Sequence, residues 1–185
     1  MARVDTIDYV TIASAGNATD FGDLTVARDS ASSCSSPTRG LFGGGDGASV
    51  FNTIDYITIA TTGNASDFGD LTDARRAGGG VSSSTRGVFM GGRDTNIIDY
   101  VTIASTGNAT DFGDMTFQQS NGKAASSKIT GVIAGGQNNS AGDAVVNSIT
   151  SITIATTGNA TDFGDLTQTV KGSGGTSNAH GGLAA

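Results

Sequence analysis

The sequence predicts an all-β protein built from four copies of one sheet module. A block of 19 residues recurs almost letter for letter, beginning at Ile7, Ile54, Ile98 and Ile149. Each block opens with β-branched and aromatic residues that alternate with a period of two, which is typical of a strand rather than a helix. The spacing within each copy is constant, and a period of 44 to 51 residues is typical of repeat architectures.

Four strand positions, named a to d, can be assigned in each module. Position c has the pattern of residues 54–60, and the turn residues 61–64 separate it from position d, residues 65–71, whose apolar anchors are Phe68 and Leu71. Position a is Gly/Ser-rich, as in residues 77–83. Position b is a short apolar strand, as in residues 87–90, and ends in two glycines. No stretch has the periodicity of a long amphipathic helix.

All variation in module length falls in one connection. The interval from the second Asp of the DFGD motif to the Gly that opens position b is 17 residues in every copy, and the interval from the leading Ile to that Asp is 16. The b–c connections, by contrast, hold 8, 5 and 12 residues, at 46–53, 93–97 and 137–148. Constant strands with one variable loop indicate a scaffold that presents loops for binding.

The order of these features resembles the kelch repeat. The matching residues are Gly91-Gly92, Tyr100, Phe112 and Met115, and the arginines after position d at Arg28 and Arg75. Kelch units carry Trp where this chain has Phe21, Phe68, Phe112 and Phe163, and we expect all four phenylalanines to lie in the core. The resemblance covers nearly the whole chain and implies four-stranded antiparallel blades around a central axis, as in a β-propeller. Similar degenerate repeats occur in proteins of bacterial viruses, which implies a virion or extracellular location.

The predicted architecture is a single domain, 1–185, forming a four-bladed kelch-like β-propeller. Three blades span approximately 26–71, 73–115 and 117–166, and a composite blade joins 168–185 to 5–24. The composite blade follows from the two ends, because the sequence opens with positions c and d and ends with positions a and b. Closure removes exposed sheet edges. Alternatively, a neighbouring chain supplies the missing strands and a homo-oligomer forms.

Charge and composition exclude several partners. The net charge is −7, the calculated pI is about 4.3, and no basic stripe suited to nucleic acid or an anionic membrane is found. No apolar run approaches the ~18 residues of a membrane span, and no signal peptide is seen. Cys34 is the single cysteine, so no internal disulfide forms.

Catalysis and metal binding are not expected. His180 is the single histidine, so neither a positioned catalytic triad nor a usual zinc site is indicated, and we expect no cofactor. The repeated aspartates, such as Asp67 and Asp70, suit either Ca²⁺ ligation or turns that bond their own backbone, and the turn interpretation is favoured. The asparagines Asn17, Asn64, Asn108 and Asn159 are interpreted as turn residues, although each lies in a glycosylation sequon.

The sequence therefore favours a non-enzymatic structural or adhesive module, associated with a phage virion, over a lectin-like glycan-binding propeller. The expected binding face holds the variable loops, with residues 2–6 at the equivalent place in the composite blade. The candidate loop residues are Asp46, Ser49, Phe51, Arg93, Asp94, Asn96, Gln137, Asn138, Asn139 and Asp143. Tyr9, Tyr56 and Tyr100 share one register and suit either sugar-stacking platforms or half-buried contacts between blades. The expected partner is a protein of a larger assembly or a surface glycan.

Overall fold

The computed structural model describes residues 3–172 and 174–175, and the regular structure in them is β except for one short 3-10 helix. Three antiparallel four-stranded sheets carry the repeats. The first sheet contains β3 (Ser32–Ser35), β4 (Arg39–Gly43), β5 (Thr53–Thr58) and β6 (Ser66–Asp70). The second contains β7 (Gly79–Ser82), β8 (Arg86–Gly92), β9 (Thr95–Thr102) and β10 (Thr110–Asp114). The third contains β12 (Lys123–Ser126), β13 (Thr130–Ala134), β16 (Ser148–Thr153) and β17 (Thr161–Asp165).

The strand order in these sheets confirms the module. In each sheet positions a, b, c and d follow in sequence as neighbouring strands. An N-terminal ribbon of β1 (Thr6–Tyr9) and β2 (Thr19–Asp23) supplies positions c and d alone. The predicted positions a and b for this ribbon fall largely on residues 176–185. These residues, which include His180, lie outside the described residues. A closed ring of four blades is therefore not shown.

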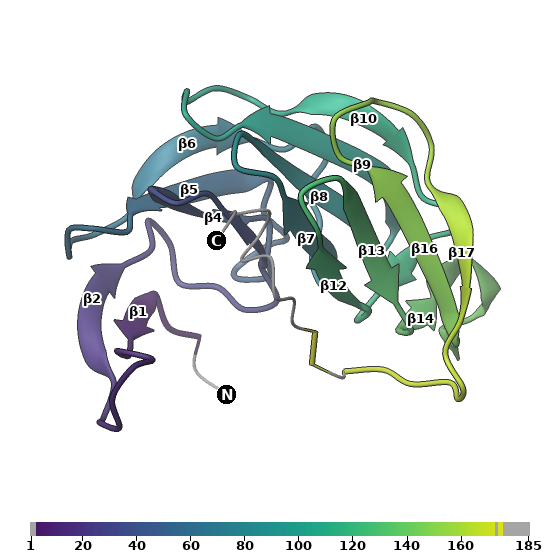
Figure 1. Ribbon diagram of the computed structural model, residues 1–185, viewed down its shortest axis with the longest axis horizontal. Helices are drawn as coiled ribbons and strands as arrows, with labels where there is room; N and C mark the ends of the chain where they lie inside the picture. Colours follow the sequence, from purple (N-terminus) through teal and green to yellow (C-terminus); the bar gives the residue numbers. More distant parts are fainter. Residues whose placement is uncertain (1–2, 173, 176–185) are drawn as a thin grey trace.

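The sheets follow one another around an open arc (Figure 1). Position d strands β6, β10 and β17 lie on the outside of the arc, and position a strands β7 and β12 lie on the inside. Neighbouring position a strands are in contact, β3 with β7 and β7 with β12. The arc is open between the N-terminal ribbon and β17 (Figure 1). No helix in the described part of the chain is long and apolar enough to cross a membrane.

Every c–d strand pair contains the same β-bulge. In the first sheet Ile54 pairs with Gly69 and Asp55 pairs with Asp67, so Phe68 is the extra residue. The register shifts at the equivalent place in the ribbon and in the other two sheets. A bulge bends the strand and redirects the extra side chain. Here it sends Phe68 into the core, where that side chain is buried.

The core lies between sheets rather than within one. One apolar cluster joins Leu41, Ile54 and Phe68 of the first sheet to Phe89 and Ile103 of the second. A second cluster joins Val88, Met90 and Phe112 of the second sheet to Ile133 and Ile154 of the third. Each sheet therefore buries apolar area mainly by packing face to face against its neighbour, which is the dominant stabilising term.

The longest b–c connection is not a plain loop. Within residues 137–148 lie β14 (Gln137–Asn138), the 3-10 helix η1 (Asn139–Ala141) and β15 (Ala144–Val145). The strands β14 and β15 join β11 (Gln119–Ser120) in a separate three-stranded sheet, in the order β11-β14-β15. The predicted position a at 77–83 is shorter than expected, since β7 covers Gly79–Ser82 and Ala77 adopts a positive φ of 57°.

The expectation that all four bulge phenylalanines are core is wrong for Phe163. That side chain is 64% exposed, whereas Phe112 is 3% exposed. The physical reason is position in the arc, because β17 has no neighbouring sheet on its outer side in the described chain (Figure 1).

Two buried ion pairs fix the segments that lead into the first and second sheets. Arg28 donates to Asp55 at 2.8 Å, and Arg75 donates to Asp99. All four side chains are essentially without solvent exposure. Burial lowers the pKa of both guanidinium groups, and the facing carboxylates oppose that shift. The second pair is completed by Thr72, which donates its backbone N–H and its hydroxyl to Asp99.

The third sheet replaces this ion pair with two neutral residues. Gln119 stands at the position of Arg75, and Thr150 stands at the position of Asp99. Both are buried, and the Gln119 amide donates to Gly135 O at 2.7 Å. One module has therefore exchanged both charges together, which avoids an unpaired buried ion.

This exchange predicts that the effects of two substitutions on the free energy of unfolding are not additive. Arg75→Gln alone leaves the Asp99 carboxylate buried without its cation and should lower the free energy of unfolding by about 3–5 kcal/mol. Arg75→Gln combined with Asp99→Thr reproduces the third sheet and should recover a large part of that loss. Urea unfolding of the wild type, both single variants and the double variant measures the coupling. A double variant at least as unstable as Arg75→Gln would contradict the compensation.

Candidate functional site

The most uniform stretch of the sequence forms the joints between sheets. The c–d turn of each sheet lies against the bulge of the preceding unit, and we call this contact the turn–bulge joint. Between the ribbon and the first sheet, Gly63 N–H donates to Phe21 O and Ala65 N–H donates to Asp23 O, both at 2.7 Å. In return, Asp23 N–H donates to Asn64 Oδ1 at 3.1 Å.

The same three bonds recur at the next two joints. Gly107 and Ala109 donate to Phe68 O and Asp70 O, and Asp70 N–H donates to Asn108 Oδ1. Gly158 and Ala160 donate to Phe112 O and Asp114 O, and Asp114 N–H donates to Asn159 Oδ1. The sequence interpretation of these asparagines as turn residues is extended by this geometry, because each side chain also binds the neighbouring sheet.

The repeated aspartates have backbone partners. Asp67 Oδ1 accepts from Gly69 N–H at 3.1 Å, and the equivalent bond is made by Asp20, Asp111 and Asp162. This local bond stabilises the bulge, as short Asx side chains do in turns. In the described residues no group of three His, Cys, Asp or Glu side chains converges into a metal-binding arrangement.

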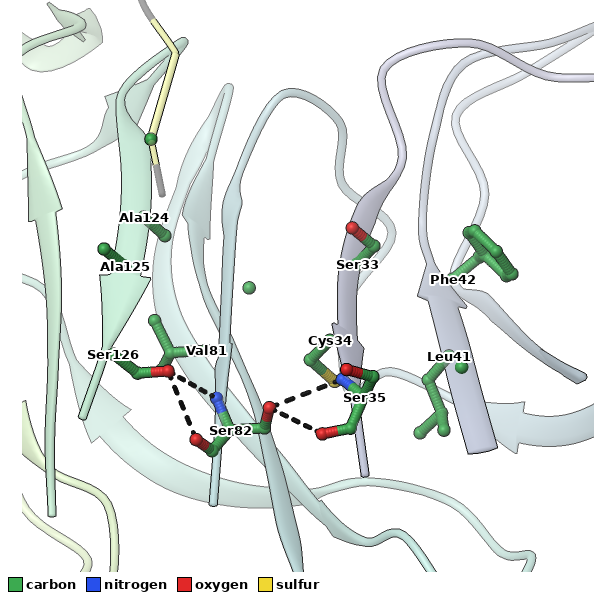
Figure 2. Close-up of a pocket in the computed structure, with 13 residues that line it drawn as sticks. Ser33, Cys34, Ser35, Leu41, Phe42, Val81, Ser82, Ala124, Ala125 and Ser126 are labelled. Carbon is green, nitrogen blue, oxygen red and sulfur yellow. Dashed lines mark hydrogen bonds between the residues drawn. The ribbon is translucent and has the colours of Figure 1, made fainter. Parts of the chain in front are cut away.

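A second line of contacts joins the sheets on the inside of the arc. Figure 2 shows Ser82 Oγ between Ser35 N and Ser35 O, at 3.3 and 2.8 Å, and Ser126 Oγ in the same relation to Ser82. These bonds cross a hollow of about 350 Å³ where β3, β7 and β12 converge. No side chain fits at Gly80, since a Cβ there would lie 2.1 Å from Ser33 O. The hollow is therefore part of the scaffold.

Cys34 also lines this hollow and is chemically inert. Burial raises the pKa of its thiol to about 12, so the thiolate is scarce at neutral pH.

The variable loops lie at one end of the sheets and are tied together by ion pairs. Asp46 contacts both Arg76 and Arg3, the latter at 3.0 Å. Arg93 of the second sheet reaches Asp143 of the third at 3.0 Å. Hydrogen bonds from Asn139 and Arg93 lower the pKa of the Asp143 carboxyl. We call this end the loop face.

The predicted loop residues differ in accessibility. Ser49 and Asp94 are exposed at the loop tips. The others are half-buried, and several are used within the protein: Asp46, Phe51, Arg93, Asn96, Gln137, Asn138, Asn139 and Asp143. Gln137, for example, donates its side-chain amide to Asp143 O at 3.1 Å. Much of the predicted binding set therefore holds the loops in place, while the tips are free for a partner.

The three tyrosines occupy equivalent sites near the opposite end, which carries the c–d turns and which we call the turn face. Tyr9, Tyr56 and Tyr100 each pack edge-on against the bulge phenylalanine, with ring centroids 5.9, 5.8 and 6.0 Å apart. Arg39 lies over the Tyr56 ring at 4.6 Å, and Arg86 lies over the Tyr100 ring at 4.4 Å. Tyr56 and Tyr100 are half-buried, and Tyr9 is 43% exposed.

Sequence reasoning missed the residues that surround these tyrosines. Arg39 and Arg86 also donate to Ile103 O and Ile154 O of the next sheet, both at 2.9 Å. The exposed threonines Thr11, Thr58, Thr102 and Thr153 stand two residues beyond the tyrosine position in each module. The sequence signal that could have identified these threonines is that Thr recurs at this exposed position in all four modules, although packing does not require it there.

Comparison with known proteins adds no identification: no protein-family model matches the chain, and no curated protein matches it.

The turn–bulge joint predicts different tolerances for two glycines with similar φ. A Cβ on Gly69 (φ +141°) would lie 2.5 Å from the Gly107 backbone, whereas a Cβ on Gly63 (φ +154°) meets nothing within 4 Å. Both Ala substitutions incur backbone strain of about 1–3 kcal/mol. Gly69→Ala should lose about a further 1–3 kcal/mol by overpacking. Thermal and urea unfolding measure the difference, and equal losses would show that the joint is not closely packed.

Proposed function

We propose that the chain is a non-enzymatic binding module whose sheets are blades of a four-bladed β-propeller, with a partner bound at the loop face. One observation carries this proposal. The constant part of each repeat is used in the joints, whereas all variation in length lies in connections that share one end of the sheets. Such a division is typical of scaffolds that bind through loops.

Ring closure is supported by the exposed residues on either side of the gap in the arc. Ile12 of the ribbon is 97% exposed, whereas its equivalents Ile103 and Ile154 are each 1% exposed. Ile59 lies beside the two-stranded ribbon and is 44% exposed. Across the gap, exposed Phe163 is the equivalent of buried Phe112. The joints between four-stranded sheets cover these positions, so each side of the gap carries one half of a joint.

The polar groups that would form the missing joint have no partner across the gap in the described chain. In the described chain, Gly16 and Asn17 of the ribbon have no sheet to contact, and the β17 carbonyls of Phe163 and Asp165 accept no bond from a turn. In the internal joints the glycine N–H donates to the Phe carbonyl, the Ala N–H donates to the Asp carbonyl, and the Asn Oδ1 accepts from the Asp N–H. In the sequence, residues 168–185 align by repeat spacing with positions a and b, and Ser177 aligns with Ser35, Ser82 and Ser126.

A non-enzymatic role is supported by the chemistry of the described residues. The one thiol is buried with a raised pKa, and the buried Arg–Asp pairs are enclosed in the scaffold. The repeated carboxylates bind backbone N–H groups. The proposed setting is a virion or the extracellular space, and the proposed partner is a protein of a larger assembly.

A lectin-like function is the second candidate. It is favoured by hollows that recur at the turn face beside the tyrosine position and share six lining positions.

Ring closure predicts the behaviour of Gly164. In the open arc a Cβ on Gly164 meets nothing within 4 Å, but a fourth joint would place Gly16 against it as Gly158 lies against Gly113. Gly164→Ala should therefore lose as much stability as Gly69→Ala. A loss no larger than that of Gly63→Ala would contradict closure. Light scattering across a range of concentrations separates closure within one 18.3 kDa chain from closure between chains.

The binding face can be tested with two charge-matched double variants. Ser49→Arg with Ala141→Arg alters the loop face at exposed positions, and Thr62→Arg with Thr106→Arg alters the turn face. On an array that displays purified proteins and glycans, we expect protein binding to be lost in the loop-face variant and kept in the turn-face variant. Protein binding that survives both changes, or no binding to any feature, would contradict the proposed function.

A further inference from the structure

A hollow recurs at equivalent positions beside the c–d turn of the ribbon, the first sheet and the third sheet. Its volume is about 120 Å³ at Tyr9, 350 Å³ at Tyr56 and 520 Å³ at Ser151. Six module positions line all three hollows, and in the first sheet they are Tyr56, Thr58, Thr61, Gly63, Asn64 and Ser66. We call this feature the turn hollow.

The lining of the turn hollow is neutral and rich in hydroxyl groups. In the first sheet it consists of threonine and serine hydroxyls, one carboxamide and the Tyr56 ring, with no Asp, Glu, Lys or Arg. Thr58, Thr61 and Ser66 are exposed, and their hydroxyls bond to no other described residue. Uncommitted hydroxyl donors and acceptors beside an aromatic wall suit a neutral polyhydroxylated ligand.

Two contacts hold this lining in a fixed shape. Asn64 Oδ1 accepts from Asp23 N–H in the turn–bulge joint, which leaves its Nδ2 group available for a ligand. The Tyr56 ring is fixed by Phe68 at its edge and by Arg39 over its face. The site is therefore organised before a ligand binds, which reduces the entropy lost on binding.

The hollow of the third sheet uses a different aromatic side chain. Ser151 replaces the tyrosine, and its hydroxyl lies 3.4 Å from Thr161 Oγ1. Phe163 and Phe112 then line the wider hollow. Hydroxyl groups and an aromatic surface are retained, although the volume and shape differ. The modules therefore offer subsites of one chemistry and graded size.

We propose that the turn hollows are subsites for neutral carbohydrate, repeated along the turn face so that one chain binds a glycan at several points. This inference rests on the proposed binding function but assigns a second face to it. A single shallow hollow binds one sugar weakly. Several hollows in one rigid scaffold raise the overall affinity, because each further contact is intramolecular.

The test replaces the exposed threonine hydroxyl in each of the three turn hollows. Thr→Val at positions 11, 58 and 153 removes three hydroxyls without changing side-chain size, and Thr→Ser at the same positions keeps them. The probes are methyl β-galactoside and N-acetylglucosamine in the 1–100 mM range, with galacturonate as a charged match for galactose. Binding is followed by amide chemical shifts in two-dimensional NMR.

We expect the neutral sugars to shift the amides of Gly16, Gly63 and Gly158 and the Asn64 side-chain NH₂. Thr→Val should weaken binding at least tenfold, Thr→Ser should retain it, and galacturonate should bind more weakly because no Lys or Arg lines the hollow of the first sheet to pair with its carboxylate. Shifts confined to residues 46–53, 93–97 and 137–148 would overturn the turn-hollow proposal while supporting the loop face. No shift up to 100 mM would also overturn it, and would leave the protein array as the independent test of the loop face.

Discussion

The fold depends on the turn–bulge joint, in which two outward-facing carbonyl groups of a position d strand accept hydrogen bonds from the c–d turn of the next sheet. At Phe21, Phe68 and Phe112 the carbonyl accepts from a glycine, and the carbonyl two residues later accepts from an alanine. The bulge redirects the aromatic side chain of the same strand into the core between sheets. The glycine that follows is required by the close approach of the turn. Sheet-to-sheet order therefore follows from contacts that the repeat keeps in these joints.

The buried charges in the described part of this scaffold are confined to Arg–Asp pairs within single modules, and one module has neutral residues at the same positions. Two modules bury an Arg–Asp pair, and a third buries Gln119 and Thr150 at the same places. A buried pair is weak evidence for net stability, because desolvation offsets much of the Coulomb attraction, whereas a single unpaired charge is costly. The joint replacement in one chain is consistent with both statements. Outside the core, the ion pair of Arg93 and Asp143 connects two of the variable loops, and Asp46 in the other loop pairs with Arg76.

Much of this arrangement could be predicted from the sequence, because period-two alternation and fixed spacing specify strands and their order. Residues 54–60 and 65–71 were expected as strands and form β5 and β6 within one or two residues. Phe163 was predicted wrongly because burial depends on a neighbouring sheet, which no local pattern encodes. The small sheet within residues 137–148 was missed because two-residue strands have no readable periodicity. The turn hollows were missed because they arise from side chains on two strands and a turn, which become neighbours only after pairing.

Identical joints have a further consequence for assembly. Because a turn–bulge joint links two different surfaces, its two free halves can meet within one chain or between chains, giving a ring or an open filament. Effective concentration decides between these outcomes. Ends held on one scaffold face each other at about millimolar effective concentration, whereas separate chains at micromolar concentration meet about a thousand times less often. The described chain forms an open arc with the ribbon and β17 on either side of its gap (Figure 1). The difference in effective concentration therefore favours the proposed closure within one chain over closure between chains.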